Sequence, residues 1–184
     1  AVAQIFNKSE IKIYKVDILS THGGSIRVYG CHIDEDKIID NSFNSLLEKE
    51  KAHGVDDLNF YKNFNKKAED IKNEFHSFLI DCKKNDLTVC GYGAAAKGNT
   101  LLNYSGIKKD LISFVCDAAP AKQNKFLPGS NIPILHPDIL NQENNIDYII
   151  IFPWNIADEI ISQLDFLKKT GTKFVKAIPK LTII

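Results

Sequence analysis

The residues with the clearest chemical potential form a glycine-rich stretch in the middle of the chain, VCGYGAAAKGNT at 89–100. Gly91, Gly93 and Ala96 match the spacing G-x-G-x-x-G/A, in which the first glycine permits a tight turn and the second lets the backbone approach a phosphate. Free N–H groups at the start of a following helix favour an anion at the same place. The stretch predicts a phosphate-binding loop, although small residues also occur at strand–helix turns for packing alone.

Charged residues near the glycine-rich stretch indicate which ligand it could bind. It is not a P-loop, because Lys97 precedes Gly98 instead of following it. Asp117 ends the next apolar run, where an acidic residue binds the ribose of a dinucleotide. Lys97 and Lys122 could add positive charge for a diphosphate, but lone lysines are more often solvated. NAD is therefore one candidate ligand.

The elements that must position this loop alternate between strand and helix from residue 86 to the end. Apolar runs of this length are typical of strands buried on both faces. We expect strands at 87–90, 111–116, 148–152 and 173–177, helices at 96–104 and 156–169, and a long loop-rich stretch at 118–136. Asn155 is expected to cap the last helix and Gly171 to end it. With right-handed crossovers, the pattern predicts an α/β fold with a Rossmann-like three-layer parallel sheet.

A second loop is expected to face the glycine loop. Ligands of open parallel sheets bind at the carboxyl ends of the strands, where strand order reverses. If strand 87–90 is central, its neighbour across that point is 148–152, which is followed by Pro153-Trp154-Asn155. The two loops should then line one crevice. Trp154 is equally consistent with a partly buried packing residue.

The N-terminal part is predicted to form a β-hairpin without the rest of a sheet. Strands are expected at 11–19 and 25–32, joined by a turn at 21–24. Two strands alone are marginal in water. We therefore expect this orphan β-hairpin to have its home sheet in an upstream domain.

Residues 34–85 are predicted to be helical. Asp40 or Asn41 caps a first helix, and a longer helix starts near Asp56 or Asp57. Apolar residues at three- and four-residue steps form one stripe along that longer helix, most simply for packing against the sheet. The chain is thus expected to comprise residues 1–33, 34–85 and 86–184.

Composition narrows the function classes. The chain has 23 basic and 23 acidic residues, whereas nucleic-acid-binding domains are usually basic. It has no apolar stretch long enough to span a membrane. The four cysteines, Cys31, Cys82, Cys90 and Cys116, form no C-x-x-C pair, so we expect no metal site and mostly buried thiols, as in the cytoplasm. A small molecule or a protein is the expected partner.

Four ordered segments closely resemble one enzyme family. The segment GYGAAAKGNTLLN at 91–103 resembles the signature of the C-terminal domain of S-adenosylmethionine-dependent sugar C-methyltransferases, which methylate a carbon of deoxyketo sugars attached to a nucleoside diphosphate. Residues 122–134 resemble the family's second motif, and residues 152–160 resemble its third. Residues 21–27 resemble the turn and last strand of its S-adenosylmethionine domain.

The resemblance implies that this chain is the C-terminal, substrate-binding part of such a transferase. The family's zinc-binding part, its general base and its S-adenosylmethionine site lie upstream, so the resemblance implies no catalytic residue here, no cofactor bound by this fragment and no activity alone. The missing N-terminal and methyltransferase domains would be its partners, and the hairpin would belong to the latter. His22 would lie near the chemistry at the domain junction, or would simply cap the hairpin turn.

The glycine loop would then hold the nucleotide of a nucleotide-sugar. The implied substrate-binding residues are His22, Gly91, Gly93, Ala94, Ala95, Lys97, Gly98, Asn99, Thr100, Lys122, Pro153, Trp154 and Asn155. Two other interpretations stay open: an NAD-binding Rossmann module of an oxidoreductase or redox sensor, and a non-catalytic nucleotide-sensing or scaffold domain. Fold alone cannot separate the three.

Overall fold

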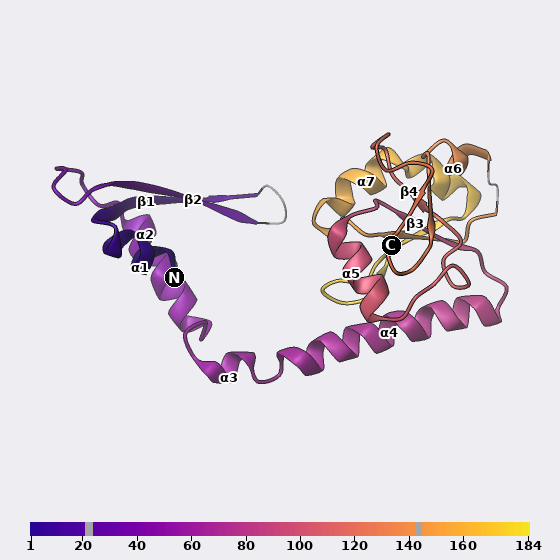
Figure 1. Cartoon of the computed structure of the whole chain (residues 1–184), viewed down its shortest axis with the longest axis horizontal. Helices are drawn as coiled ribbons and strands as arrows, with labels where there is room; N and C mark the ends of the chain where they lie inside the picture. The colour runs from indigo at the N-terminus through magenta and orange to yellow at the C-terminus, as the bar shows by residue number, and fades with distance from the viewer. Residues whose placement is uncertain (21–23, 143–144) are drawn as a thin grey trace. The chain divides into compact units, whose positions relative to one another are not determined.

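The computed structural model describes residues 1–20, 24–142 and 145–184 (Figure 1). The chain divides into two compact units, residues 1–65 and 66–184, and each is described by itself. The first unit contains α1 (Val2–Lys8), β1 (Ile11–Leu19), β2 (Ser25–His32), α2 (Asn41–Ala52) and α3 (Leu58–Tyr61). The long helix α4 (Phe64–Lys84) leads into the second unit.

The predicted hairpin is present. Strands β1 and β2 pair antiparallel, and among the described strands they pair only with each other. The alternation of side chains sets their register: apolar Val16 lies opposite Val28 on one face, and polar Lys15 lies opposite Tyr29 on the other. The hydroxyl of Tyr29 donates to the carboxylate of Asp17 at 2.7 Å, which supports the polar face.

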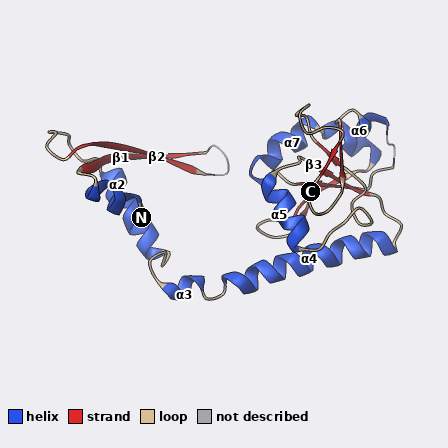
Figure 2. Cartoon of the chain, in the orientation of Figure 1, coloured by secondary structure: helices blue, strands red, loops and turns tan. Residues whose placement is uncertain are grey.

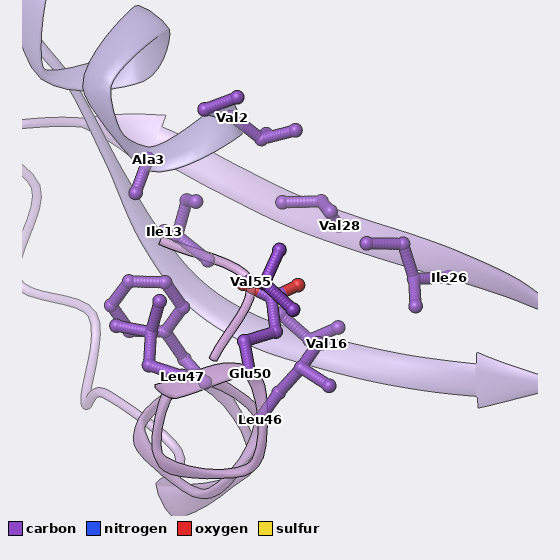
Figure 3. Close-up of a pocket in the computed structure, with 12 residues that line it drawn as sticks. Val2, Ala3, Ile13, Val16, Ile26, Val28, Leu46, Leu47, Glu50 and Val55 are labelled. Carbon is purple, nitrogen blue, oxygen red and sulfur yellow. The ribbon is translucent and has the colours of Figure 1, made fainter. Parts of the chain in front are cut away.

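Helix α2 covers part of the apolar face of the hairpin. Asp40 caps α2 as predicted, since its carboxylate accepts from the N–H of Ser42 at 2.7 Å. Helices α1 and α2 and the hairpin together border an open apolar groove of about 220 Å³ (Figure 3). Its lining includes Val16, Ile26, Val28 and Leu46.

The long helix predicted from Asp56 or Asp57 is broken in the structure. Asp57 caps the short helix α3, and a turn at residues 62–63 separates α3 from α4, which begins at Phe64. Asn63 lies in the break and Asn65 in the first turn of α4, and asparagine is a poor helix former. The expectation of one continuous helix is therefore wrong.

The apolar stripe is buried only where it runs beside the sheet. Phe75, Leu79 and Cys82 of α4 are buried, whereas the side chains of Leu58 and Phe64 are 81% and 68% exposed. The sheet packs against only the last turns of α4, so the prediction of core packing holds for the second half of the stripe and fails for the first.

The second unit is built on a seven-stranded sheet (Figure 2). Its strands are β3 (Val89–Tyr92), β4 (Val115–Cys116), β5 (Lys125–Phe126), β6 (Pro133–Leu135), β7 (Tyr148–Ile151), β8 (Lys173–Lys176) and β9 (Thr182–Ile183). Their order is β5-β6-β4-β3-β7-β8-β9. The five inner strands are parallel, and the two edge strands are antiparallel.

Two hydrophobic clusters fill the two faces of this sheet. On one face α4 and α5 (Ala96–Tyr104) contribute Phe75 and Leu102, which meet alternate strand residues such as Ile150. On the other face α6 (Ile139–Gln142) and α7 (Ala157–Gln163) contribute Leu140 and Ile160. The three layers and the inner strand order confirm the predicted Rossmann-like α/β fold.

The stretch predicted to be loop-rich contributes two strands. Strand β6 extends the parallel sheet beyond β4, and β5 pairs with it at the edge. Strand β9 and helix α6 were also not expected. These elements are two to four residues long, too short to produce a periodic pattern in the sequence.

The last predicted helix is shorter than expected. The chain forms a 3-10 turn at Trp154–Ile156, then α7, and then a second 3-10 segment at Asp165–Thr170. Asn155 does not cap α7 as predicted, because it lies inside the first 3-10 turn and its side-chain oxygen is bound by Lys97. Gly171 ends the last segment as predicted, with a left-handed φ of 87°.

Candidate functional site

The glycine loop joins β3 to α5 at the carboxyl end of the central strand. Gly91 lies within β3 rather than in the turn, so the predicted tight turn belongs to Gly93, which has a φ of 87°. Ala95 precedes the first helical residue, and its side chain offers no capping oxygen. The start of α5 therefore depends on its backbone geometry, and its N–H groups are not capped by a side chain.

Close packing brings this loop against the segment that follows β7. A Cβ atom at Gly93 would clash with the ring of Pro153, and one at Gly98 would lie 2.5 Å from the Cβ of Phe152. Strand β3 pairs in parallel with β7, as the sequence predicts. The strand order reverses between these two strands, so the glycine loop and residues 153–155 meet at the switch point of the sheet.

Several N–H groups of the loop are already used within the fold. Gly93 donates to the carbonyl of Cys116, Ala94 to the carboxylate of Asp117, and Ala95 to the carbonyl of Gly93. The first N–H groups of an α-helix have no partner one turn earlier, and here these belong to residues 96–98. An anion would therefore bind to the first turn of α5 rather than to the glycines themselves.

Asp117 is enclosed by donors from two loops. Its carboxylate accepts from the N–H of Ala94 at 2.7 Å, the N–H of Ala119 at 2.8 Å and the ammonium of Lys122 at 3.0 Å. Burial raises the pKa of the Asp117 carboxyl, but these hydrogen bonds outweigh burial and hold it below the ordinary value of 3.8. The predicted ribose-binding acid is thus an internal link between the glycine loop and the loop that carries Lys122.

Lys97 joins the glycine loop to the facing loop. Its ammonium lies 4.7 Å from the centre of the Trp154 ring and donates a hydrogen bond to the side-chain oxygen of Asn155. Lys97, Trp154 and Asn155 are all only partly buried, so solvent or a ligand can reach them.

The other predicted residues lie at the edge of this cluster. Thr100 is exposed, and its hydroxyl donates to the carbonyl of Ala96 in its own helix. The side-chain oxygen of Asn99 is buried and has no partner among the described residues. His22 lies outside the described residues.

One residue of the site was not predicted for its role. Phe152, which is almost completely buried, is the surface on which Gly91 and Gly98 pack. The apolar run 148–152 placed it at the end of a strand, but only the strand pairing shows that it faces the glycine loop.

All four cysteines lie in the described part of the chain and form no disulfide. Burial raises the pKa of the Cys116 thiol to about 12 and that of Cys82 to about 11, which keeps both protonated and unreactive. The described residues contain no group of His, Cys, Asp and Glu side chains arranged to hold a metal ion. No helix among them is long and apolar enough to cross a membrane.

The strand order, with the glycine loop at its switch point, defines a domain of the Rossmann-like α/β class. Comparison with known proteins narrows this class. Residues 20–179 match the family model described as the C-methyltransferase C-terminal domain, and the chain belongs to that family. Over 185 aligned residues it is 29% identical to C-methyltransferase NovU of Streptomyces niveus. The alignment covers the whole chain but only 44% of that relative's length.

Proposed function

We propose that this chain is the C-terminal, substrate-binding part of an S-adenosylmethionine-dependent methyltransferase that acts on a carbon of a nucleotide-linked keto-deoxysugar. Family membership supports the methyltransferase class. The observation that carries the substrate assignment is the contact between the glycine loop and residues 153–155 at the switch point, with the free N–H groups of α5 beside it. A diphosphate at α5 would place the rest of the nucleotide beside Trp154.

In the implied reaction, this chain binds the substrate, and residues outside it supply the base and bind the methyl donor. A base removes a proton from the carbon next to the ketone, and the resulting enolate carbon attacks the methyl group of S-adenosylmethionine, which leaves as S-adenosylhomocysteine. Such a reaction needs a positioned base and donors for the developing oxyanion. The described residues of the site contribute binding and orientation of the nucleotide and include no group that we assign as the base.

We propose that S-adenosylmethionine does not bind at the glycine loop of this chain. The cofactor carries an adenosine ribose, and the acidic residue placed to bind a ribose hydroxyl is Asp117. Its carboxylate is enclosed by Ala94, Ala119 and Lys122. We therefore place the cofactor site in a part of the protein outside this chain.

The same observation weakens the NAD alternative. A ribose hydroxyl of NAD would have to reach a carboxylate that is buried and already accepts three hydrogen bonds. Lys122 is already paired with this carboxylate, so it contributes less net positive charge to a ligand than the sequence suggests. A nucleotide held mainly through its diphosphate avoids both problems.

We further propose that the hairpin and its groove pack against an upstream methyltransferase domain. Ile18 and Ile26 lie opposite each other on the apolar face and are 66% and 48% exposed. More than half of the relative's length lies outside the alignment, which is enough for such a domain. The division into residues 1–33, 34–85 and 86–184 belongs to this proposal, as do a cytoplasmic location and the lack of activity of this chain alone.

Thermal unfolding with and without ligand tests the proposal. A thymidine-diphosphate sugar should raise the melting temperature of the chain, whereas NAD should not. Trp154→Ala should reduce the shift, and Phe166→Ala, which removes an exposed aromatic side chain from another segment, should leave it unchanged. Stabilisation by NAD alone would reject the substrate assignment. Methyl transfer from S-adenosylmethionine by the 184-residue chain alone would reject the division of labour.

A further inference from the structure

Three features of the switch point converge on the side chain of Lys97. It begins in the first turn of α5, beside the N–H groups that have no helical partner. Its ammonium is nevertheless directed to the facing loop, where it meets the side-chain oxygen of Asn155 and the ring of Trp154. A cation at the start of a helix is repelled by the positive end of the helix dipole, so these two contacts hold Lys97 in a place that its own helix disfavours.

The contacts that hold Lys97 are weaker than those a diphosphate would offer. Asn155 supplies a neutral oxygen, and Trp154 supplies only the partial negative charge of its ring face. A phosphate oxygen carries negative charge, and hydrogen bonds between two charged groups are about twice as strong as neutral ones. An anion bound to the first turn of α5 would also remove the repulsion between the helix end and the ammonium.

We propose that Lys97 is a diphosphate-binding residue that changes partners when the ligand binds. Without ligand, Asn155 and Trp154 hold its ammonium. When a diphosphate binds at the start of α5, the ammonium leaves these two residues and binds the diphosphate. This inference rests on the proposed nucleotide-binding function and adds an exchange of partners to it. Asn155 then acts on the ligand through Lys97 and is a positioning residue. The exchange also uncovers the face of Trp154 at the moment of binding.

The chain offers a direct reporter, because Trp154 is its only tryptophan. Inorganic pyrophosphate is the probe, since it does not absorb where tryptophan is excited. Its affinity is measured by calorimetry on the 184-residue chain and on Lys97→Ala, Asn155→Ala and the double variant. Trp154 emission is recorded in the same titrations. Thermal unfolding verifies that each variant folds, and Lys97→Gln replaces Lys97→Ala if the latter does not.

The exchange predicts a specific pattern. Lys97→Ala should weaken pyrophosphate binding about tenfold, the effect of losing one charge-assisted hydrogen bond, and abolish the emission change. Asn155→Ala should tighten binding a few-fold, because Lys97 no longer has to leave a partner, and should have no effect when Lys97 is already alanine. Lys83→Ala removes the same charge from the end of α4, which leads into the amino end of β3, whereas the glycine loop follows the carboxyl end of that strand. This variant should change affinity less than about twofold.

The outcomes separate this inference from the proposed function. If pyrophosphate binds the unaltered chain and the Lys97 variants equally well, the exchange is rejected and the anion site stands. If Asn155→Ala weakens binding as much as Lys97→Ala, Asn155 contacts the ligand itself and the exchange is also rejected. If the unaltered chain binds no pyrophosphate, the anion site and the exchange are both rejected.

Discussion

Gly98 occupies a helical position at which alanine would ordinarily be better. Replacing glycine by alanine inside a helix favours folding by about 1 kcal/mol through propensity alone. At Gly98, however, the new Cβ would lie 2.5 Å from the Cβ of Phe152, which is buried. Overpacking of this kind costs about 1–3 kcal/mol. Gly98→Ala should therefore lower the free energy of unfolding by about 1 kcal/mol, as measured by urea denaturation.

An exposed helical site provides the matched control. Ser77 lies on the exposed face of α4, so Ser77→Ala should leave stability unchanged or slightly raised. A stabilising effect of Gly98→Ala as well would show that the two loops are not closely packed at the switch point.

Asp117 should make the stability of the chain sensitive to acid. Its pKa in the folded chain lies below the ordinary value of 3.8. The ionised carboxylate therefore stabilises the fold above that value, and this contribution is lost as the pH falls through the folded pKa. Asp117→Asn should lower the free energy of unfolding near neutral pH by roughly 1–3 kcal/mol, because the buried donors lose their charged partner.

The pH profile distinguishes this effect from a simple packing defect. Unfolding curves of the unaltered chain and Asp117→Asn should converge as the pH is lowered below 3.8. Asp86→Asn removes the same charge at an exposed turn whose left-handed backbone asparagine tolerates, and it should leave the profile unchanged. A constant difference between the curves at every pH would contradict the assigned role of Asp117.

At the scale of elements, the apolar stripe through α3 and α4 should be energetically uneven. Phe75 is completely buried between α4 and the sheet, whereas Leu58 is 81% exposed. Phe75→Ala should cost about 3–5 kcal/mol of unfolding free energy, and Leu58→Ala should change it by less than about 0.5 kcal/mol. Chemical denaturation of the two variants measures both. Comparable losses would mean that Leu58 is covered in solution.

At the scale of the whole molecule, the second unit should fold without the first. Both hydrophobic clusters of the sheet draw only on residues from Ile71 onward. Residues 64–184 also contain the complete seven-stranded sheet and all of α4. Residues 64–184 expressed alone should therefore show one cooperative thermal transition, followed by circular dichroism.

The site should survive the same truncation, because every residue of the cluster at the switch point lies in the second unit. Residues 64–184 should bind pyrophosphate as tightly as the 184-residue chain does. Loss of the cooperative transition would show that residues 1–63 are needed for folding. Loss of binding with folding intact would show that the anion site includes residues of the first unit.

Local sequence patterns, which involve residues close together in the chain, were sufficient to predict much of the secondary structure. The alternation of apolar residues predicts the hairpin, and buried runs predict β3, β7 and β8. The strand expected at 111–116 is present only as β4, at Val115–Cys116. Asp40 as a cap and Gly171 as a stop follow from the chemistry of helix ends. The glycine spacing and the strand order together predict that the glycine loop meets residues 153–155, because the topology of such sheets is restricted.

Only the tertiary structure decides which partner each polar side chain takes. Asn155 is a natural helix cap by its local sequence, but Lys97, 58 residues away, binds its oxygen instead. Asp117 stands where a ribose-binding acid would be, but Ala94, 23 residues earlier, shares its carboxylate with two other donors. A local pattern carries no information about a competing donor that is distant in the chain, and a buried polar group binds the donors that the fold brings to it. The sequence therefore determined where the candidate site lies, and the packing of its loops decided which groups remain available to a ligand.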